Sequence, residues 1–217
     1  SKHLVERELA ITGGTVKAVE YALKYGVAGN IAGGTHHAYR DRGEGFCLLN
    51  DAAVAAAVAL RRLKIKKILI VDLDVHQGNG TAKIFEDEPR VFTFSMHGAK
   101  NYPLHKEKSD LDIALPDGTG DDEYLKRLRE ALPRLIDETT PDLIFFQSGV
   151  DVLGTDKLGR LGMTVEGCRR RDNIVFKSAF KHGIPLVFNM GGGYSERIAV
   201  IVEAHANTYR AAQEIYF

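Results

Sequence analysis

The chain has 217 residues, of which 44% are hydrophobic and 27% are charged, so one sizeable α/β domain with an apolar core is expected. Its 29 basic and 29 acidic residues give a formal net charge of +0, which argues against broad electrostatic binding to nucleic acid or to a membrane surface. The two cysteines form no CxxC pair, no apolar run can span a bilayer and no signal peptide is visible, which favours a reducing, cytoplasmic location.

Apolar runs and helical patterns alternate along the chain. Gly13-Gly14 interrupts the first helical pattern, which predicts a loop or frayed turn and then a helix from about Thr15 to Tyr25. Further helices are expected over 52–63, capped by Asn50 or Asp51, and near 81–85, 121–138, 164–182 and up to 215. Strands are expected between them at 27–32, 68–71, 90–96, 111–115, 142–147 and 184–189. This alternation predicts one three-layer αβα domain, residues 1–217, with a mainly parallel central sheet.

Distinctive polar residues follow four of the expected strands. They are His36-His37 after the first, Asp74 and His76 after the second, Asp151 after the fifth and Tyr194 after the last. Because the carboxyl ends of parallel strands share one edge of the sheet, we expect these side chains to converge there.

The second strand carries Asp72, Asp74 and His76 at alternate positions, so their side chains should point to one side of an extended chain. Burying these groups is costly unless something compensates their charge. A strand-end turn and its cap would explain one aspartate, whereas three polar groups on one buried face favour a divalent metal. Oxygen and nitrogen ligands without a thiolate suit a catalytic Zn²⁺, and other divalent transition metals also fit.

A third ligand would have to come from another strand end. Asp151 is the best-placed carboxylate, and Asp156, deeper in the following loop, is the alternative. Asp151 also has a structural interpretation, as the cap of the next turn.

The His36-His37 pair has two interpretations. Adjacent histidines are often solvated loop residues, but this pair follows a strand and two glycines beside the expected metal site. That position favours proton transfer, for which histidine has the ordinary pKa nearest neutral. Cys47 is a candidate nucleophile nearby, although nothing distinguishes it from a small buried hydrophobic residue.

The glycines at 191–193 lack the GxGxxG spacing and the lysine of phosphate-binding loops. We expect them to let the backbone approach a ligand closely, so that Tyr194 directs its hydroxyl into the site as a hydrogen-bond donor.

Five segments together resemble the histone deacetylase superfamily, which also includes acetoin-utilisation proteins and acetylpolyamine amidohydrolases. In chain order they are GGTHHA at 33–38, GFCLLNDAAVA at 45–55, DLDVHQGNGTA at 72–82, SGVD at 148–151 and GGGYS at 191–195. The QGNG variant and the stretch LGTDKLGRLGMT at 153–164 are most similar to the class IV branch and its bacterial relatives. The resemblance implies an arginase/deacetylase-like fold.

The resemblance also implies roles for individual residues. The matching positions are the zinc ligands Asp74, His76 and Asp151, the proton-handling histidines His36 and His37, and the carbonyl-polarising Tyr194. The walls of the acyl-lysine tunnel match Gly45, Phe46, Tyr102 and Gly192, and a structural K⁺ site matches Asp72, Asp74, Ser95 and Met96. Asp72 matches the carboxylate behind the first histidine. Asn79 stands where many members have Asp behind the second, so His37 should be less biased toward its charged form.

The expected function is zinc-dependent hydrolysis of an N-acetyl amide, most simply acetyl-lysine in a protein or peptide, with one Zn²⁺ per chain. The alternatives are an acetylpolyamine or long-chain acyl-lysine amidohydrolase, a two-manganese ureohydrolase, and an inactive acyl-lysine binding module. Members of the family usually carry several tens of residues before the helix at Thr15 that supply a first strand, so a missing first strand is expected here.

Overall fold

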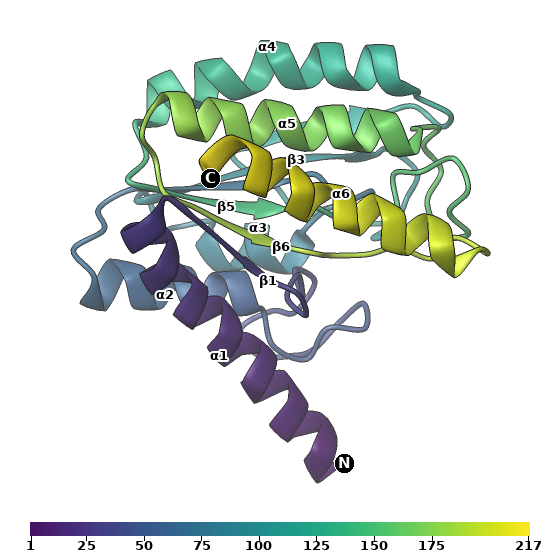
Figure 1. Ribbon diagram of the computed structural model, residues 1–217. Coiled ribbons are helices and arrows are strands. Elements are labelled where there is room, and N and C mark those ends of the chain that lie inside the picture. Colours follow the sequence, from purple (N-terminus) through teal and green to yellow (C-terminus); the bar gives the residue numbers. More distant parts are fainter.

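A six-stranded sheet with the order β1-β6-β5-β2-β3-β4 lies at the centre of the molecule (Figure 1). The computed structural model describes residues 1–217. The strands are β1 (Val27–Asn30), β2 (Ile68–Asp72), β3 (Val91–Gly98), β4 (Leu111–Leu115), β5 (Leu143–Gln147) and β6 (Leu186–Asn189). Every pair of neighbouring strands is parallel, which confirms the predicted α/β class and mainly parallel sheet.

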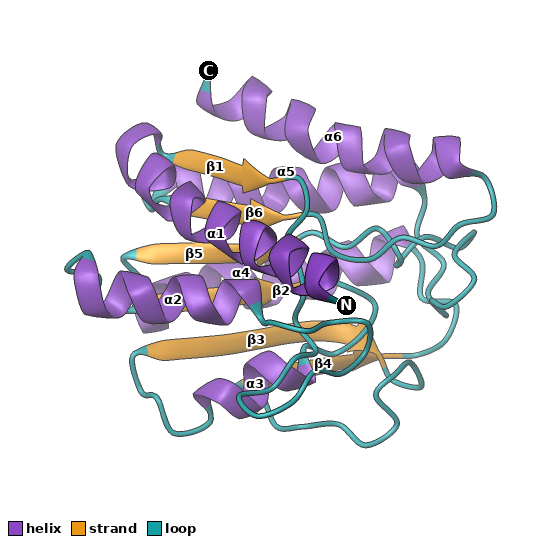
Figure 2. Cartoon of the chain, turned by 90° about the horizontal axis from the view of Figure 1, so that it is seen from below, coloured by secondary structure: helices purple, strands orange, loops and turns teal.

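Helices cover both faces of this sheet (Figure 2). One face carries α1 (Lys2–Tyr25), α2 (Asp51–Arg62) and α3 (Asn79–Phe85), and the other carries α4 (Asp121–Thr139), α5 (Val165–Lys181) and α6 (Ile198–Tyr216). Strand β2 shows why both faces need cover, because all five of its residues are buried. Ile68 and Ile70 join the apolar cluster under α1 and α2, whereas Leu69 and Val71 join the cluster under α4, α5 and α6.

The predicted loop at Gly13-Gly14 is wrong, because α1 is one continuous helix from Lys2 to Tyr25. The side chain of Asn30 from β1 lies against the helix at this point, and its Nδ2 donates to the backbone oxygen of Ile11 at 2.9 Å. A Cβ at Gly14 would be 3.0 Å from that nitrogen. One glycine is therefore explained by a close approach between a helix and a strand.

Side chains cap α2 and α5, and the Asn50 cap is one that the sequence predicts. Asn50 caps α2 and accepts from the backbone N–H of Ala53, and Thr164 caps α5 and accepts from the N–H of Gly167. Acidic residues 121–123 open α4, where the helix dipole favours them. None of the helices combines the length and the apolar composition needed to cross a lipid bilayer.

Candidate active site

A cavity of about 660 Å³ opens at the carboxyl ends of the strands. Its lining includes His36 and His37 after β1, Asp74 and His76 after β2, Asp151 after β5 and Tyr194 after β6. The parallel sheet thus brings together side chains from four separate segments, as the sequence predicts.

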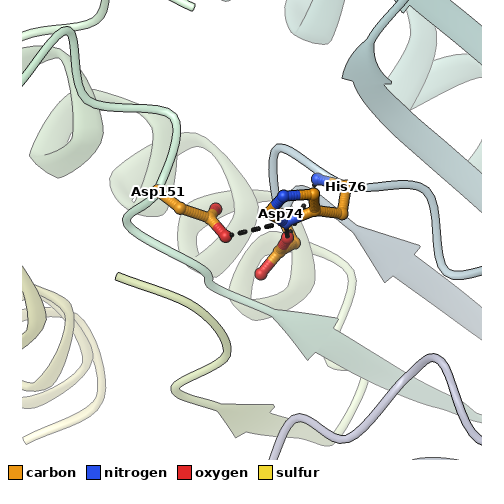
Figure 3. A group of neighbouring side chains, drawn as sticks. All are labelled: Asp74, His76 and Asp151. Atoms are coloured by element: carbon orange, nitrogen blue, oxygen red, sulfur yellow. Dashed lines mark hydrogen bonds and ion pairs between the residues drawn. The ribbon is translucent and has the colours of Figure 1, made fainter. Parts of the chain in front are cut away.

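Asp74, His76 and Asp151 form one buried group whose ligand atoms all lie within 4.8 Å of one another. Figure 3 shows the imidazole of His76 beside both carboxylates. Its Nδ1 is 3.0 Å from Asp74 Oδ1 and 3.1 Å from Asp151 Oδ2. It is the only group of three or more acidic, histidine or cysteine side chains in the molecule with the geometry to hold a metal ion.

The surrounding backbone fixes these two carboxylates. At two positions beside them only glycine fits, because any side chain would collide with a carboxylate oxygen. A Cβ at Gly149 would lie 2.2 Å from Asp74 Oδ2, and one at Gly192 would lie 2.1 Å from Asp151 Oδ2. The N–H of Gly192 donates to Asp74 Oδ2 and that of Val75 to Asp151 Oδ1, both at 2.9 Å. The glycines therefore allow backbone donors to orient both acids toward one point.

The charges of this group also favour a cation. Burial, together with the negative charge of Asp74, raises the pKa of Asp151 to about 7. Burial opposes a charge on His76, yet hydrogen bonds to Asp151 and Asp74 raise the pKa of its imidazole to about 10. Two carboxylates and an imidazole, with no thiolate, match the donor set of a catalytic zinc ion.

The adjacent histidines have different partners behind them. His36 Nδ1 lies 2.6 Å from Asp72 Oδ2, a carboxylate, and His37 Nδ1 lies 2.7 Å from Asn79 Oδ1, an amide. Burial opposes a charge on His36, but Asp72 and then Asp74 raise its pKa to about 9. Burial, followed by the positive charge of His36, lowers the pKa of His37 to about 3. The pair therefore combines a cationic and a neutral imidazole.

Aromatic rings surround the entrance to these groups. The ring centroids of Tyr102 and His37 are 5.1 Å apart, and those of Phe46 and Tyr194 are 6.5 Å apart. Phe46 is 89% exposed, so it stands at the mouth of the cavity and not in its depth. Cys47 also lines the cavity, but burial raises the pKa of its thiol to about 12, which does not suit a nucleophile.

The chain matches the model of the histone deacetylase domain over residues 1–209. The chain belongs to the histone deacetylase family. It is 47% identical over 216 residues to an uncharacterised protein of Picosynechococcus sp., which covers 100% of this chain and 72% of that protein. It is 37% identical to histone deacetylase 2 of Arabidopsis thaliana, covering 88% of this chain and 50% of that protein.

Solved structures of this histone deacetylase superfamily have the same fold. The HD domain of HDA15 superposes with a TM-score of 0.79 at 26% identity, over 94% of this chain and 62% of that one. The acetylpolyamine aminohydrolase of Burkholderia pseudomallei superposes with a TM-score of 0.79 at 25% identity, over 94% of this chain and 61% of that one. The chain thus spans less than two thirds of either structure.

Asp156, the alternative third ligand, lies outside the metal-binding group of this deacetylase-family chain. Its Oδ1 accepts from the N–H groups of Leu158 and Gly159, each at 2.8 Å, and its other oxygen accepts from the N–H of Tyr194. Asp156 therefore shapes the two loops at the cavity mouth, and Asp151 is the carboxylate that completes the candidate metal-binding group.

The expected potassium site stays a prediction. Ser95 pairs in register with Asp72 across β2 and β3, and its Oγ is 2.9 Å from His97 Nδ1. The class IV assignment likewise stays a prediction.

Sequence reasoning missed four residues that contribute to the candidate site. Asp51 was expected only as a helix cap, yet its buried carboxylate accepts from the N–H groups of Gly34 and Thr35 at 3.1 and 2.9 Å. It thereby anchors the loop that carries the two histidines. Lys100 and Arg160 line the cavity, but they come from loops with no strand-end signal.

Arg171 of α5 is the fourth missed contributor and is completely buried. Its guanidinium donates to the backbone oxygens of Leu73, Ser148 and Gly149 at 3.2, 3.0 and 2.6 Å, and its Nε donates to Asp172 at 2.8 Å. Leu73 precedes a metal-ligand candidate, so Arg171 joins the ends of β2 and β5 from behind the site. In the sequence it is one of three consecutive arginines, and nothing marks it as the buried one.

Proposed function

We propose that this protein is a zinc-dependent deacetylase that hydrolyses the acetyl amide of a lysine side chain in a protein or peptide. The observation that carries the proposal is the buried group Asp74, His76 and Asp151, which lies in one cavity with the His36-His37 pair and Tyr194. Membership of the histone deacetylase family supports the reaction class.

Asp74, His76 and Asp151 would hold one zinc ion, which when bound supplies a Lewis acid for the amide carbonyl and lowers the pKa of water. The neutral imidazole of His37 takes a proton from the attacking water at Nε2, because its Nδ1 is engaged with Asn79. The same imidazole then returns a proton to the amide nitrogen. The C–N bond breaks, the free amine leaves and acetate remains.

His36 has a different role in this proposal. Its bond to Asp72 keeps it cationic beside His37, with the two ring centroids 4.1 Å apart. A fixed positive charge there stabilises the negative charge that develops on the carbonyl oxygen of the substrate amide. It also keeps the resting His37 unprotonated, which a base requires.

Tyr194 would donate its hydroxyl proton in a hydrogen bond to the carbonyl oxygen. It lines the cavity, and burial with the nearby Asp74 and Asp151 raises its pKa, so the phenol keeps its proton. A donor that is fixed before the reaction stabilises the oxyanion without reorganising.

The cavity mouth favours an acetyl-lysine substrate over an acetylpolyamine. Apart from Asp74 and Asp151 in its depth, the charged non-histidine side chains that line the cavity are Lys100 and Arg160. Both also pair with Asp117, at 3.8 and 3.5 Å, which leaves this cluster with one net positive charge. The further ammonium groups of a polyamine would meet repulsion there.

Two other candidate functions fit less well. A two-manganese ureohydrolase needs more carboxylates than the single three-residue group supplies. A module that only binds acyl-lysine has no use for a ligand group, a histidine pair and a tyrosine together.

The test combines elemental analysis with hydrolysis of a fluorogenic acetyl-lysine peptide, with and without a chelator, and of N-acetylspermidine. We expect about one zinc per chain and chelator-sensitive turnover of the peptide in preference to the polyamine. Preference for the polyamine would overturn the substrate assignment. A folded chain that binds no metal would overturn the site assignment, and two metals per chain would favour the ureohydrolase.

A further inference from the structure

Asn79 presents its two amide atoms to different partners. Its Oδ1 lies 2.7 Å from His37 Nδ1, and its Nδ2 donates to Glu44 Oε1 at 2.8 Å and to the hydroxyl of Tyr39 at 3.0 Å. An amide can rotate by half a turn and exchange these atoms at little steric cost. One of its partners must therefore determine which atom faces the histidine.

Glu44 is the partner that distinguishes the two amide orientations. The hydroxyl of Tyr39 accepts from Asn79 and donates to Glu107 Oε1 at 3.2 Å, but it can rotate to donate to a rotated Asn79, so it opposes that orientation less than a carboxylate does. The carboxylate of Glu44 can only accept, and a rotated Asn79 would place its oxygen against that carboxylate at hydrogen-bond distance. Hydrogen bonds to Glu44 from Tyr102 and Asn79 lower its pKa although its partial burial opposes this, so it is ionised.

The orientation of Asn79 determines where His37 carries its proton. With Oδ1 facing the ring, Nδ1 must donate, and Nε2 keeps a free lone pair on the cavity side. With Nδ2 facing the ring, Nδ1 would have to accept, and the proton would sit on Nε2. A general base in that second state could not take a proton at Nε2.

We propose that Glu44 is a positioning residue: it fixes the Asn79 amide so that His37 is held in the Nδ1–H tautomer with Nε2 free. This inference rests on the proposed function, in which His37 is the base. His36 needs no such relay, because Asp72 is itself a carboxylate and contacts the ring directly.

Glu44 is well held for this role and also reaches the cavity wall. Tyr102 donates its hydroxyl to Glu44 Oε1 at 2.6 Å, and Arg42 Nε lies 3.5 Å from Oε2. The backbone of Glu44 exchanges two hydrogen bonds with that of Cys47, at 2.8 and 2.9 Å. One carboxylate oxygen therefore joins the aromatic wall of the cavity to the partner of the base.

The test is Glu44→Gln in the full, zinc-loaded chain, because the glutamine amide has nearly the same shape but can donate as well as accept. Long-range ¹H–¹⁵N correlation spectra of the eight histidines report which ring nitrogen carries the proton, with the signals of His37 assigned by their loss in His37→Phe. The wild type should show only the Nδ1–H form of His37. The variant should show a mixture of both forms.

The kinetic effect should appear in kcat more than in KM. A half-populated wrong tautomer lowers kcat for the acetyl-lysine peptide about twofold, and a dominant one lowers it further. Tyr39→Phe is the matched control, because it removes the other acceptor of the Asn79 amide and leaves Glu44 in place, and His37 should stay in the Nδ1–H form.

Two results would overturn the inference: a wild type in which His37 carries its proton on Nε2, or a Glu44→Gln variant that keeps the pure Nδ1–H form. A tautomer change in Glu44→Gln from a wild type that hydrolyses no acetyl amide would support the positioning by Glu44 and refute the proposed function instead.

Discussion

At the scale of single residues, the site depends on which partner stands behind each histidine. His36 and His37 are neighbours in the chain and their rings almost touch, yet the pKa of one is raised and that of the other is lowered. A carboxylate behind His36 outweighs the cost of its burial, whereas the neutral amide behind His37 does not. The difference between the Asp72 carboxylate and the Asn79 amide thus contributes to the opposite directions of the two pKa shifts.

Tyr194→Phe tests the proposed donor to the carbonyl oxygen. The substitution removes only a hydroxyl that lines the cavity, so we expect zinc content to be unchanged. Deacetylation of the fluorogenic acetyl-lysine peptide should fall about 100- to 1,000-fold in kcat, the range found when one oxyanion donor is removed. Elemental analysis of the variant serves as the control. A kcat near that of the wild type would show that Tyr194 does not polarise the carbonyl.

At the scale of elements, strands and caps could be predicted because their signals are local. The signals for β2 (an apolar run) and for the start of α2 (the Asn50 cap) each lie within a few consecutive residues. Helix α1 could not be predicted in full, because two consecutive glycines usually indicate a helix break. The reason for Gly14 is the side chain of Asn30 in β1, which lies against the helix there only in the folded chain. A close approach between elements has no local signature.

The two glycines of α1 give a matched pair of variants. A Cβ at Gly13 would meet no atom within 4 Å, so Gly13→Ala should raise the free energy of unfolding by about 0.5–1 kcal/mol. Gly14→Ala should raise the free energy of unfolding by less than Gly13→Ala, or lower it, because its Cβ would lie only 3.0 Å from Asn30 Nδ2. Urea denaturation measures both. Equal gains in the two variants would contradict the packing seen between α1 and β1.

At the scale of the whole molecule, the candidate site combines residues from all parts of the chain. The motifs that carry the candidate metal ligands and the histidine pair were visible in the sequence because each follows a strand. Asp51 and Arg171 were not, since their function depends on which backbone atoms the folded chain brings to them. Prediction therefore reached residues that lie in motifs at strand ends, and missed residues such as Asp51 and Arg171 whose role depends on distant backbone atoms.

Acid stability is a further property of the whole molecule. Burial, followed by the positive charge of Arg171, lowers the pKa of His205 to about 4, so the folded chain resists a proton that the unfolded chain accepts near its ordinary pKa. This contribution is complete above the ordinary pKa of histidine and is lost as the pH falls toward about 4.

His205→Gln should remove this dependence. Between about pH 6 and pH 4.5, the free energy of unfolding of the variant should fall less steeply than that of the wild type, by up to about 1.4 kcal/mol per pH unit. His3→Gln, at an exposed residue of α1, is the control and should leave the slope unchanged. Denaturant unfolding at several pH values measures the slopes, and parallel slopes for His205→Gln and wild type would contradict the prediction.

The buried guanidinium of Arg171 has a consequence for the order in which the molecule is made. It donates to the backbone oxygen of Leu73, which precedes it by 98 residues. The ribosome therefore makes β2 long before it makes Arg171. Until α5 packs on the sheet, the backbone oxygens of Leu73, Ser148 and Gly149 at the ends of β2 and β5 lack this donor. The carboxyl edge of the sheet, where the candidate metal-binding group lies, is therefore completed only after α5 has been synthesised and has docked.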